Sequence, residues 1–319
     1  MKIKIGLITV GNHCQKNIIP SLIAMDDVEI VSFYTRSLDT ASVVTKKYNI
    51  TYYEDLDKML AEAEINFVYI TSPNALHYPH IIKALNNKIN VIVEKTAISN
   101  LHQAEKVVDL AAKHNLLVYE AFMYRHHQQF SRLKEIIDNE TYGIVKKVFI
   151  NFGFPHLAKT DIRYSKELDG GALLDAGAYT ISAMNSLLGE NEYKNSGIYF
   201  ENHSVDVNGY AIFKNTKNVQ CFLNWGFGLG YKNEIQIWTN EGVIMIDRAF
   251  SKPSNFAAKI YHIKNGIETI DSCYTGNHFE RMFKFVFSLD KAKYKTVNNE
   301  LITQINTIEL ILKKENSIA

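Results

Sequence analysis

The feature that most constrains the fold is the way short apolar runs alternate with amphipathic segments over the first 122 residues. The apolar runs predict strands, and the segments between them carry apolar residues at three- and four-residue spacing, which predicts helices. The expected strands are 2–9, 28–35, 67–71, 91–93 and 117–119, and the expected helices are 16–25, 38–47, 78–86 and 101–114. Strands and helices that alternate in this way form repeated βα units. The pattern therefore predicts an α/β domain over residues 1–122 with a doubly wound parallel sheet.

The character of the sequence changes after Glu120, where longer segments alternate apolar and polar residues on a two-residue period. Such segments, joined by polar turns, are typical of antiparallel strands. The expected strands are 145–154, 205–213, 219–225, 234–239 and 243–247, and helical patterns cover 130–137, 171–188, 278–287 and 301–312. We therefore expect a second, α+β domain over residues 123–319 with a large, mostly antiparallel open sheet.

Composition excludes several classes of protein. The 319 residues suit two domains. A formal net charge of +1 provides no field that would gather nucleic acid or an anionic membrane, so we expect neither as a partner. The three cysteines, Cys14, Cys221 and Cys273, form no CxxC pair, no cluster has metal-ligand spacing, and no apolar run is long enough to span a membrane. We expect a cytoplasmic protein without a metal site.

A nucleotide-binding turn is expected directly after the first strand, where the chain reads Val10-Gly11-Asn12-His13. Thr9 and Cys14 stand where the first and third small residues of a GxGxxG fingerprint would be, which leaves Gly11 to let the backbone approach a pyrophosphate. The alternative is a tight strand-to-helix turn without a ligand. Its place in the first βα unit favours binding, by residues 10–13.

The end of the second strand points to the type of cofactor. An acidic residue there would take the ribose hydroxyls of NAD, whereas this chain has Thr35-Arg36-Ser37. Two hydroxyls around an arginine suit a 2′-phosphate, so NADP(H) is preferred, with NAD(H) possible. The alternative is an arginine that is simply solvated at the start of a helix.

Two further segments end strands at the carboxyl edge of the sheet, where ligands of open α/β sheets bind. Thr71-Ser72-Pro73-Asn74, followed by His77, ends one strand and Glu94-Lys95-Thr96 ends the next. Charges at the end of an apolar strand are unfavourable unless they are paired or used. A structural salt bridge would account for Glu94 and Lys95, and a lysine that faces a nicotinamide is the functional alternative.

In the second domain, a helix of unusually small residues carries Asp175 and Tyr179, which are four residues apart and so share one face. Tight packing of the helix against a large, flat side chain would explain the small residues. Together with Lys95, however, Asp175 and Tyr179 would form a set of polar groups beside a cofactor ring.

These motifs resemble those of the glucose–fructose oxidoreductase/inositol dehydrogenase (Gfo/Idh/MocA) family over nearly the whole chain. The matching strings are Ser72-Pro73-Asn74 with His77, Glu94-Lys95-Thr96, Glu120-Ala121-Phe122-Met123-Tyr124-Arg125 and Asp175-Ala176-Gly177-Ala178-Tyr179. A narrower likeness, to the NDP-hexose 3-ketoreductases, rests on Met123–His127, Asp161–Tyr164, Asp206–Gly209 and the run Asp247–Pro253.

The resemblance implies a Rossmann domain, an active site between the two domains, and an open sheet that often serves as an oligomer interface, so we expect a homo-oligomer, either a dimer or a tetramer. This sequence departs from the family at Thr9, where a glycine is usual, and at Thr96, where the family has proline. We expect the loss of proline to loosen the backbone that aims Lys95.

For a ketoreductase we expect Lys95 to donate the proton that the carbonyl oxygen needs when hydride arrives, because a cationic donor stabilises the developing alkoxide. Tyr179 is the alternative donor. Asp175 would orient Lys95 or a sugar hydroxyl, and Arg163 would meet a substrate phosphate or carboxylate. Two other functions remain open at this point: a dehydrogenase of a free sugar, inositol or diol, and a non-catalytic NADP-binding protein.

Overall fold

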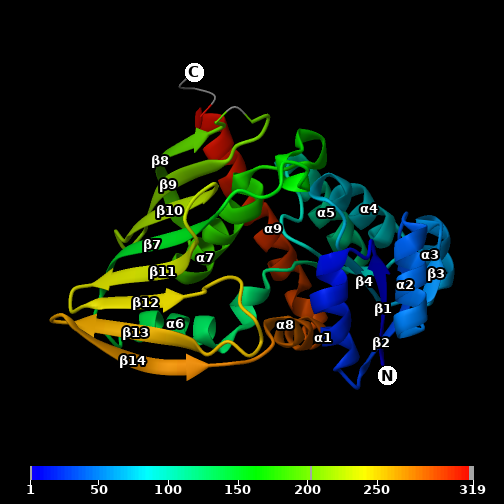
Figure 1. Ribbon diagram of the computed structural model, residues 1–319, viewed down its shortest axis with the longest axis horizontal. Helices are drawn as coiled ribbons and strands as arrows, with labels where there is room; N and C mark the ends of the chain where they lie inside the picture. The colour runs from blue at the N-terminus through cyan, green and yellow to red at the C-terminus, as the bar shows by residue number, and fades with distance from the viewer. Residues whose placement is uncertain (1, 202, 316–319) are drawn as a thin grey trace. The chain divides into compact units, whose positions relative to one another are not determined.

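The computed structural model describes residues 2–201 and 203–315, and the chain divides into two compact units (Figure 1). The first unit contains Met1–Ala121 and Phe279–Ile305, and the second contains Phe122–His278 and Asn306–Ala319. Each unit has its own sheet. The predicted boundary after residue 122 therefore needs a correction, because a segment near the C-terminus returns to the first unit.

The first unit is built on a six-stranded parallel sheet in the order β3-β2-β1-β4-β5-β6. The strands are β1 Ile3–Ile8, β2 Val28–Tyr34, β3 Thr51–Tyr53, β4 Phe67–Ile70, β5 Asn90–Val93 and β6 Val118–Glu120. Every residue of β4 is buried, which explains why it reads as a continuous apolar run and not as an alternating one. The predicted α/β class is confirmed; β3 was not predicted.

Three helices of this unit begin at polar side chains that accept hydrogen bonds from a free N–H group of the first turn. Ser37, Asp55 and Asn100 cap helices α2, α3 and α5 in this way. The helices are η1 Cys14–Ile18, α1 Ile19–Ile23, α2 Leu38–Tyr48, α3 Leu56–Glu62, η2 Asn74–Leu76, α4 His77–Asn86 and α5 Leu101–His114. The first of them, η1, is a π-helical turn that continues into α1.

The C-terminal segment joins the first unit through aromatic packing and backbone hydrogen bonds. Helix α8 (His278–Phe287) sets Phe283 edge-on to Tyr69, with ring centroids 5.5 Å apart. After the short turn η7 (Lys291–Lys293), helix α9 (Tyr294–Glu315) carries Asn298, whose Oδ1 accepts from Val118 N at 2.8 Å. These contacts explain why residues 279–305 belong with the first sheet.

The second unit contains an eight-stranded sheet in the order β14-β13-β12-β11-β7-β10-β9-β8. Its pairs are antiparallel except for β7 with β10. The strands are β7 Val145–Phe154, β8 Asn191–Tyr199, β9 Asn208–Asn215, β10 Gln220–Phe227, β11 Lys232–Thr239, β12 Val243–Asp247, β13 Ala258–Lys264 and β14 Ile267–Tyr274. The predicted mostly antiparallel sheet is confirmed, although β8, β13 and β14 were not predicted.

Helices cover one face of this sheet, and α6 and α7 lie on the same side of it in Figure 1. They are η3 Met123–His126, α6 Gln128–Asp138, η4 Ile162–Tyr164, η5 Lys166–Leu168, η6 Leu173–Gly177 and α7 Ala178–Leu188. A Cβ added to Gly177 would lie 3.1 Å from Trp225 Cδ2, so the small residues do serve close packing against a flat ring. The helix predicted over 171–188 begins with a π-helical turn, η6, which shifts the phase between Asp175 and Tyr179.

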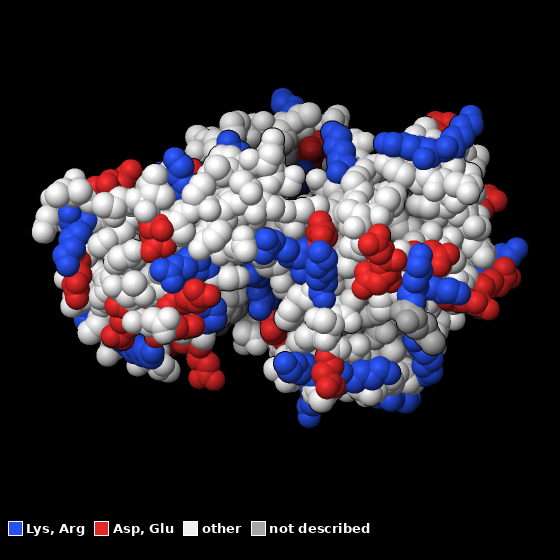
Figure 2. Space-filling view, turned by 90° about the horizontal axis from the view of Figure 1, so that it is seen from below, with Lys and Arg blue, Asp and Glu red and all other residues white. Residues whose placement is uncertain are grey.

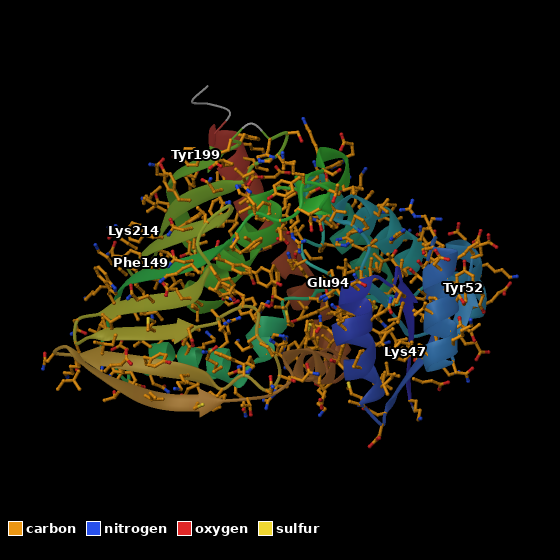
Figure 3. All side chains as sticks on the ribbon, in the orientation of Figure 1. Lys47, Tyr52, Glu94, Phe149, Tyr199 and Lys214 are labelled. Carbon is orange, nitrogen blue, oxygen red and sulfur yellow. The ribbon has the colours of Figure 1, made fainter. Side chains whose placement is uncertain are left out.

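The opposite face of the sheet carries half-exposed residues, among them Phe149, Tyr199 and Lys214, which Figure 3 labels along it. Figure 2 shows lysine and arginine mixed with aspartate and glutamate on the face that it displays, in keeping with the formal net charge of +1. Among the residues that the structure describes, no helix is both long enough and apolar enough to span a membrane.

Candidate active site

The turn after β1 keeps the backbone shape of a glycine-containing nucleotide turn although its first position is threonine. Thr9 has φ of 66°, a left-handed conformation that is unfavourable for a β-branched residue. The Thr71 hydroxyl donates a hydrogen bond to the Thr9 carbonyl oxygen, which helps to hold this conformation. Thr9 therefore adopts a left-handed conformation that ordinarily favours glycine.

Gly11 provides open space in front of this turn. It is exposed, and a Cβ added to it would meet no atom within 4 Å. Gln15 N donates to Gly11 O at 3.0 Å, so the helix starts directly after Gly11 and its first N–H groups have no partner within the helix. A helix N-terminus beside open space suits a pyrophosphate, so the residues present fit a dinucleotide cofactor.

Cys14, the other atypical residue of the turn, is fully buried. Burial raises the pKa of its thiol to about 12. Cys14 is therefore a small core residue and not a reactive thiol.

The end of β2 presents the predicted 2′-phosphate residues. Thr35 is buried, and its Oγ1 accepts a hydrogen bond from Ser37 N at 3.4 Å. The Ser37 hydroxyl is used to cap α2, whereas Arg36 between them is exposed. The arginine is thus held at a fixed point of the backbone while its guanidinium remains accessible.

His80 lies beside this position and was not predicted from the sequence. Its Nδ1 is 3.0 Å from Ser72 Oγ, and its ring is edge-on to that of Tyr34. Burial first, and then the nearby positive groups His77, Lys83 and Arg36, lower the pKa of His80 to about 4. The only sequence signal was its place in the first turn of the helix that follows Ser72-Pro73-Asn74.

Glu94, at the end of β5, is tied to the nucleotide turn. Its Oε1 lies 2.8 Å from His13 Nε2 and accepts from the Tyr69 hydroxyl at 2.7 Å. Burial acts to raise the pKa of Glu94, but the charge and hydrogen bond of His13 and the hydroxyl of Tyr69 outweigh it, so this pKa is lowered. The carboxylate is ionised and also faces Lys95, whose charge contributes to the same lowering. Figure 3 labels Glu94 in this unit.

His77, which was expected among the cofactor-binding residues, is fully buried, and both ring nitrogens face backbone carbonyl oxygens, those of Ser72 and Thr96. The reason is that α4 begins at His77 and turns the ring inward toward β5. His77 therefore contacts backbone and not an exposed groove.

In the second unit, the structure brings Asp175 and Arg163 together. Arg163 Nε donates to Asp175 Oδ2 at 2.7 Å, and Arg163 Nη1 donates to Asp161 Oδ1 at 3.1 Å. Burial acts against the charged guanidinium, but the two carboxylates outweigh it and raise the pKa of Arg163. Arg163 is thus a permanent cation, and a substrate phosphate would have to bind alongside these carboxylates.

Tyr179 lies in a cluster of aromatic rings. Its ring contacts those of Phe122, Tyr124, Phe152 and Phe250 at centroid distances of 5.3 to 5.9 Å. Only 7% of Tyr179 is exposed, and its hydroxyl lies 3.7 Å from the Met123 sulfur. The cluster fixes the ring firmly, as is required of a side chain that must present its hydroxyl in one direction.

Asp206, which the sequence analysis did not assign to the site, holds the start of the segment that carries Asp175. Its Oδ2 accepts from Leu173 N at 2.7 Å, and its carbonyl oxygen accepts from Ala172 N at 2.9 Å. The only sequence hint was its place in the string Asp206–Gly209. Within residues 2–201 and 203–315, no three His, Cys, Asp or Glu side chains are placed to hold a metal ion.

Two family descriptions match the chain. "Oxidoreductase family, NAD-binding Rossmann fold" covers residues 3–122, and "GFO/IDH/MocA C-terminal domain" covers residues 130–245. The first match covers all six strands of the first sheet, and the second reaches from α6 into β12 of the second sheet.

Individual proteins resemble the chain over most of its length. A dTDP-3,4-didehydro-2,6-dideoxy-alpha-D-glucose 3-reductase from Saccharopolyspora spinosa is 27% identical over 83% of this chain and 80% of that protein. A D-xylose 1-dehydrogenase (NADP(+)) from Haloferax volcanii is 26% identical over 96% of this chain and 95% of that protein. A solved 3-ketoreductase from Actinomadura kijaniata, in complex with NADP and TDP-benzene, has a TM-score of 0.90 and 22% identity and covers 98% of both chains.

Proposed function

The chain belongs to the Gfo/Idh/MocA family of oxidoreductases, and on this premise we propose that it uses NADPH to reduce a keto group of a nucleotide-linked hexose, such as a deoxyhexose. The observation that carries the proposal is that the similarity to a dTDP-sugar 3-reductase spans 83% of the chain. The accessible Arg36 after β2 supports NADPH as the cofactor.

The cofactor, when bound, supplies the hydride; the chain's own residues hold it and manage the proton. We propose that residues 10–13 receive the pyrophosphate and that Thr35, Arg36 and Ser37 receive the 2′-phosphate. Thr71–Asn74 and Glu94 complete the cofactor-facing edge of the sheet.

Lys95 is the proposed proton donor to the carbonyl oxygen of the substrate, since a cationic donor stabilises negative charge as it develops there. Tyr179 is the alternative donor. Asp175 and Arg163 are proposed to face the sugar or its phosphates, where the fixed ion pair between them provides one acceptor and one donor.

The test is a comparison of two assays with one preparation. NADPH oxidation is measured with a dTDP-linked 3-keto-deoxyhexose, and NADP⁺ reduction is measured with free aldoses, inositol and diols. We expect turnover in the first assay and at least roughly a hundredfold smaller kcat/KM in the second, because a site that pairs buried polar groups with its substrate rejects analogues that lack them.

A second candidate is favoured by one observation. The xylose dehydrogenase from Haloferax volcanii matches 96% of this chain, a larger share than the reductase matches. Turnover confined to free sugars would replace the main proposal with this oxidative one. NADPH binding without turnover in either assay would leave a non-catalytic NADP-binding protein.

We also propose that the chain forms a homo-oligomer, a dimer or tetramer, through the outer face of the second sheet. On that face Phe149 stacks on Phe222 at 4.9 Å and contacts Trp238 at the same distance, and Trp238 is 41% exposed. Exposed apolar patches of this kind are usually covered by a partner. Light scattering of Phe149→Asp/Trp238→Asp should give a monomer, while the exposed Leu38→Asp in the first unit should leave the wild-type mass.

A cytoplasmic location is part of the proposal. Its support is that Cys14, Cys221 and Cys273 are free thiols, as expected of a protein in a reducing compartment.

A further inference from the structure

The backbone that carries Lys95 leaves the sheet just before this residue. The backbone hydrogen bonds that continue the sheet here run from Glu94 N to Ile70 O at 2.9 Å and from Ala121 N to Val93 O at 2.8 Å. Beyond them, Thr96 and Ala97 are buried. Buried backbone groups need partners, so something other than the sheet must satisfy them.

Two side chains from neighbouring elements do this. His77, the first residue of α4, places Nδ1 2.8 Å from Thr96 O, and Glu120, the last residue of β6, accepts from Ala97 N with Oε1 at 2.9 Å. Both side chains are buried, and His77 is not exposed at all. The backbone on the C-terminal side of Lys95 is therefore held from two directions by groups in the same unit.

These contacts bear on Thr96, which stands where the resemblance implies a proline. A proline ring restricts its own φ and the residue before it. In this chain, which lacks the ring, the carbonyl of Thr96 and the amide of Ala97 are each fixed by a side chain instead. The expected loosening of the segment is thus countered by two hydrogen bonds.

We propose that His77 and Glu120 are positioning residues that set the direction of the Lys95 side chain by holding the backbone of residues 96 and 97. The inference rests on the proposed function, in which Lys95 donates a proton to the substrate. Neither residue needs to touch the substrate or the cofactor. Proton transfer depends steeply on donor placement, so loss of either contact should lower kcat.

His77 has a second contact, which makes a sharp test possible. Its Nε2 lies 2.7 Å from the carbonyl oxygen of Ser72, in the segment proposed to face the cofactor. Burial lowers the pKa of His77, so its neutral ring carries a single N–H, which we place on Nδ1, toward Thr96. Asn at this position places an amide N–H₂ near the site of Nδ1 and so can still donate to Thr96. Gln places its amide near the site of Nε2, where it faces Ser72 and cannot donate to Thr96.

The two variants should therefore differ in kcat. His77→Gln loses the Thr96 contact and should lower kcat about tenfold, with the KM for NADPH within about twofold of wild type, as expected for one buried hydrogen bond. His77→Asn keeps a donor toward Thr96 and should retain most of the wild-type kcat. Equal effects of both variants on kcat would contradict the proposal, because a general loss of folding makes no such distinction.

Glu120 provides an independent pair of variants. Glu120→Ala removes the acceptor for Ala97 N and should lower kcat about tenfold, whereas Glu120→Gln keeps an oxygen in place and should restore most of it. A Glu120→Gln loss as large as that of Glu120→Ala would remove Glu120 from the proposal.

Hydrogen exchange tests the same contacts without any substrate. In His77→Gln and Glu120→Ala, exchange in a peptide covering residues 94–98 should accelerate, and acylation of Lys95 by an N-hydroxysuccinimide ester should change in rate. Faster exchange with unchanged turnover would refute the link to Lys95. If the wild type reduces no keto sugar, the proposed function fails. The positioning role is tested separately: unchanged hydrogen exchange and an unchanged rate of Lys95 acylation in the variants would refute it.

Discussion

The stability of the second unit should depend on pH through Asp206, which anchors the segment that carries Asp175. Burial raises the pKa of Asp206 from 3.8 to about 6, against the opposing hydrogen bonds from backbone N–H groups. A carboxyl group whose pKa is higher in the folded than in the unfolded state binds more protons when folded between these two values. Its contribution to the free energy of unfolding therefore falls as pH rises through this range.

The magnitude follows from the two pKa values. A rise from 3.8 to about 6 corresponds to about 3 kcal/mol over the full range, and to roughly 2 kcal/mol between pH 4.5 and 7. In Asp206→Asn the side chain cannot ionise, and its oxygen can still accept from Leu173 N. The free energy of unfolding of the variant, relative to wild type, should thus increase by roughly 2 kcal/mol over this interval.

Urea unfolding followed by tryptophan fluorescence measures this quantity in one unit alone, because the two tryptophans of the chain, Trp225 and Trp238, both belong to the second unit. With a slope of about 2 kcal/mol per molar urea, the difference in midpoint between variant and wild type should grow by about 1 M from pH 4.5 to 7. A difference that stays constant with pH would refute the assignment of a raised pKa to Asp206.

Three further predictions concern the cofactor end of the first sheet. Gly11→Ala should leave the thermal unfolding temperature unchanged but weaken NADPH binding about tenfold, because the added methyl group meets no protein atom and occupies the space proposed for the pyrophosphate. Gly230→Ala, where a Cβ is equally free of contacts, is the matched control. An unaltered NADPH affinity in Gly11→Ala would contradict the proposed pyrophosphate site. Thr9→Gly should raise the free energy of unfolding, measured by calorimetry, by about 1 kcal/mol, since glycine adopts the left-handed conformation without the steric strain of a β-branched residue. A lower free energy of unfolding would show that the Thr9 side chain is needed. Arg36→Ala should weaken NADPH at least tenfold more than NADH in titrations of both, and equal losses would exclude a 2′-phosphate contact.

Strand positions were predicted best where one face of the sheet is buried, because apolar residues then recur at every second position. The strands 145–154 and 243–247 were predicted with the bounds that the structure has, because their residues alternate between a buried and an open face. Strands β8 and β14 lie at the two edges of their sheet; β14 has no buried residue and β8 is buried only over Ser196–Ile198, so neither shows a regular apolar alternation. β3 has only three residues, too few to show a period.

Contacts between residues far apart in the sequence could not be predicted. The helical patterns near the C-terminus were recognised, but the packing of Phe283 on Tyr69 joins positions more than two hundred residues apart. Local periodicity shows that a helix has an apolar face and does not show which sheet receives it. Assigning the whole of 123–319 to one domain therefore failed for residues 279–305.

The candidate site likewise contains residues whose position follows from a local sequence pattern and residues whose contacts depend on distant parts of the chain. The structure places Glu94 and Arg36 directly after strands β5 and β2, as the sequence pattern predicted, at the carboxyl edge where ligands of parallel sheets bind. His80 and Asp206 could not be predicted, because their roles come from what lies next to them in space. The contacts of His77 with the carbonyl oxygens of Ser72 and Thr96 could not be predicted either, since the direction of a side chain at the start of a helix cannot be read from its position in the sequence.

The central claim is that this chain transfers a hydride from NADPH to a keto carbon of a nucleotide-linked hexose while Lys95 donates the proton. The most direct measurement is deuterium transfer from NADPH labelled at C4 of the nicotinamide to a dTDP-linked 3-keto-deoxyhexose, followed in wild type, Lys95→Met and Tyr179→Phe. We expect label on the carbinol carbon with wild type, and a rate lower by about two to four orders of magnitude in Lys95→Met with NADPH still bound. Absence of label with wild type would contradict the claim, and a near-normal rate in Lys95→Met with a large loss in Tyr179→Phe would transfer the proton-donating role to Tyr179.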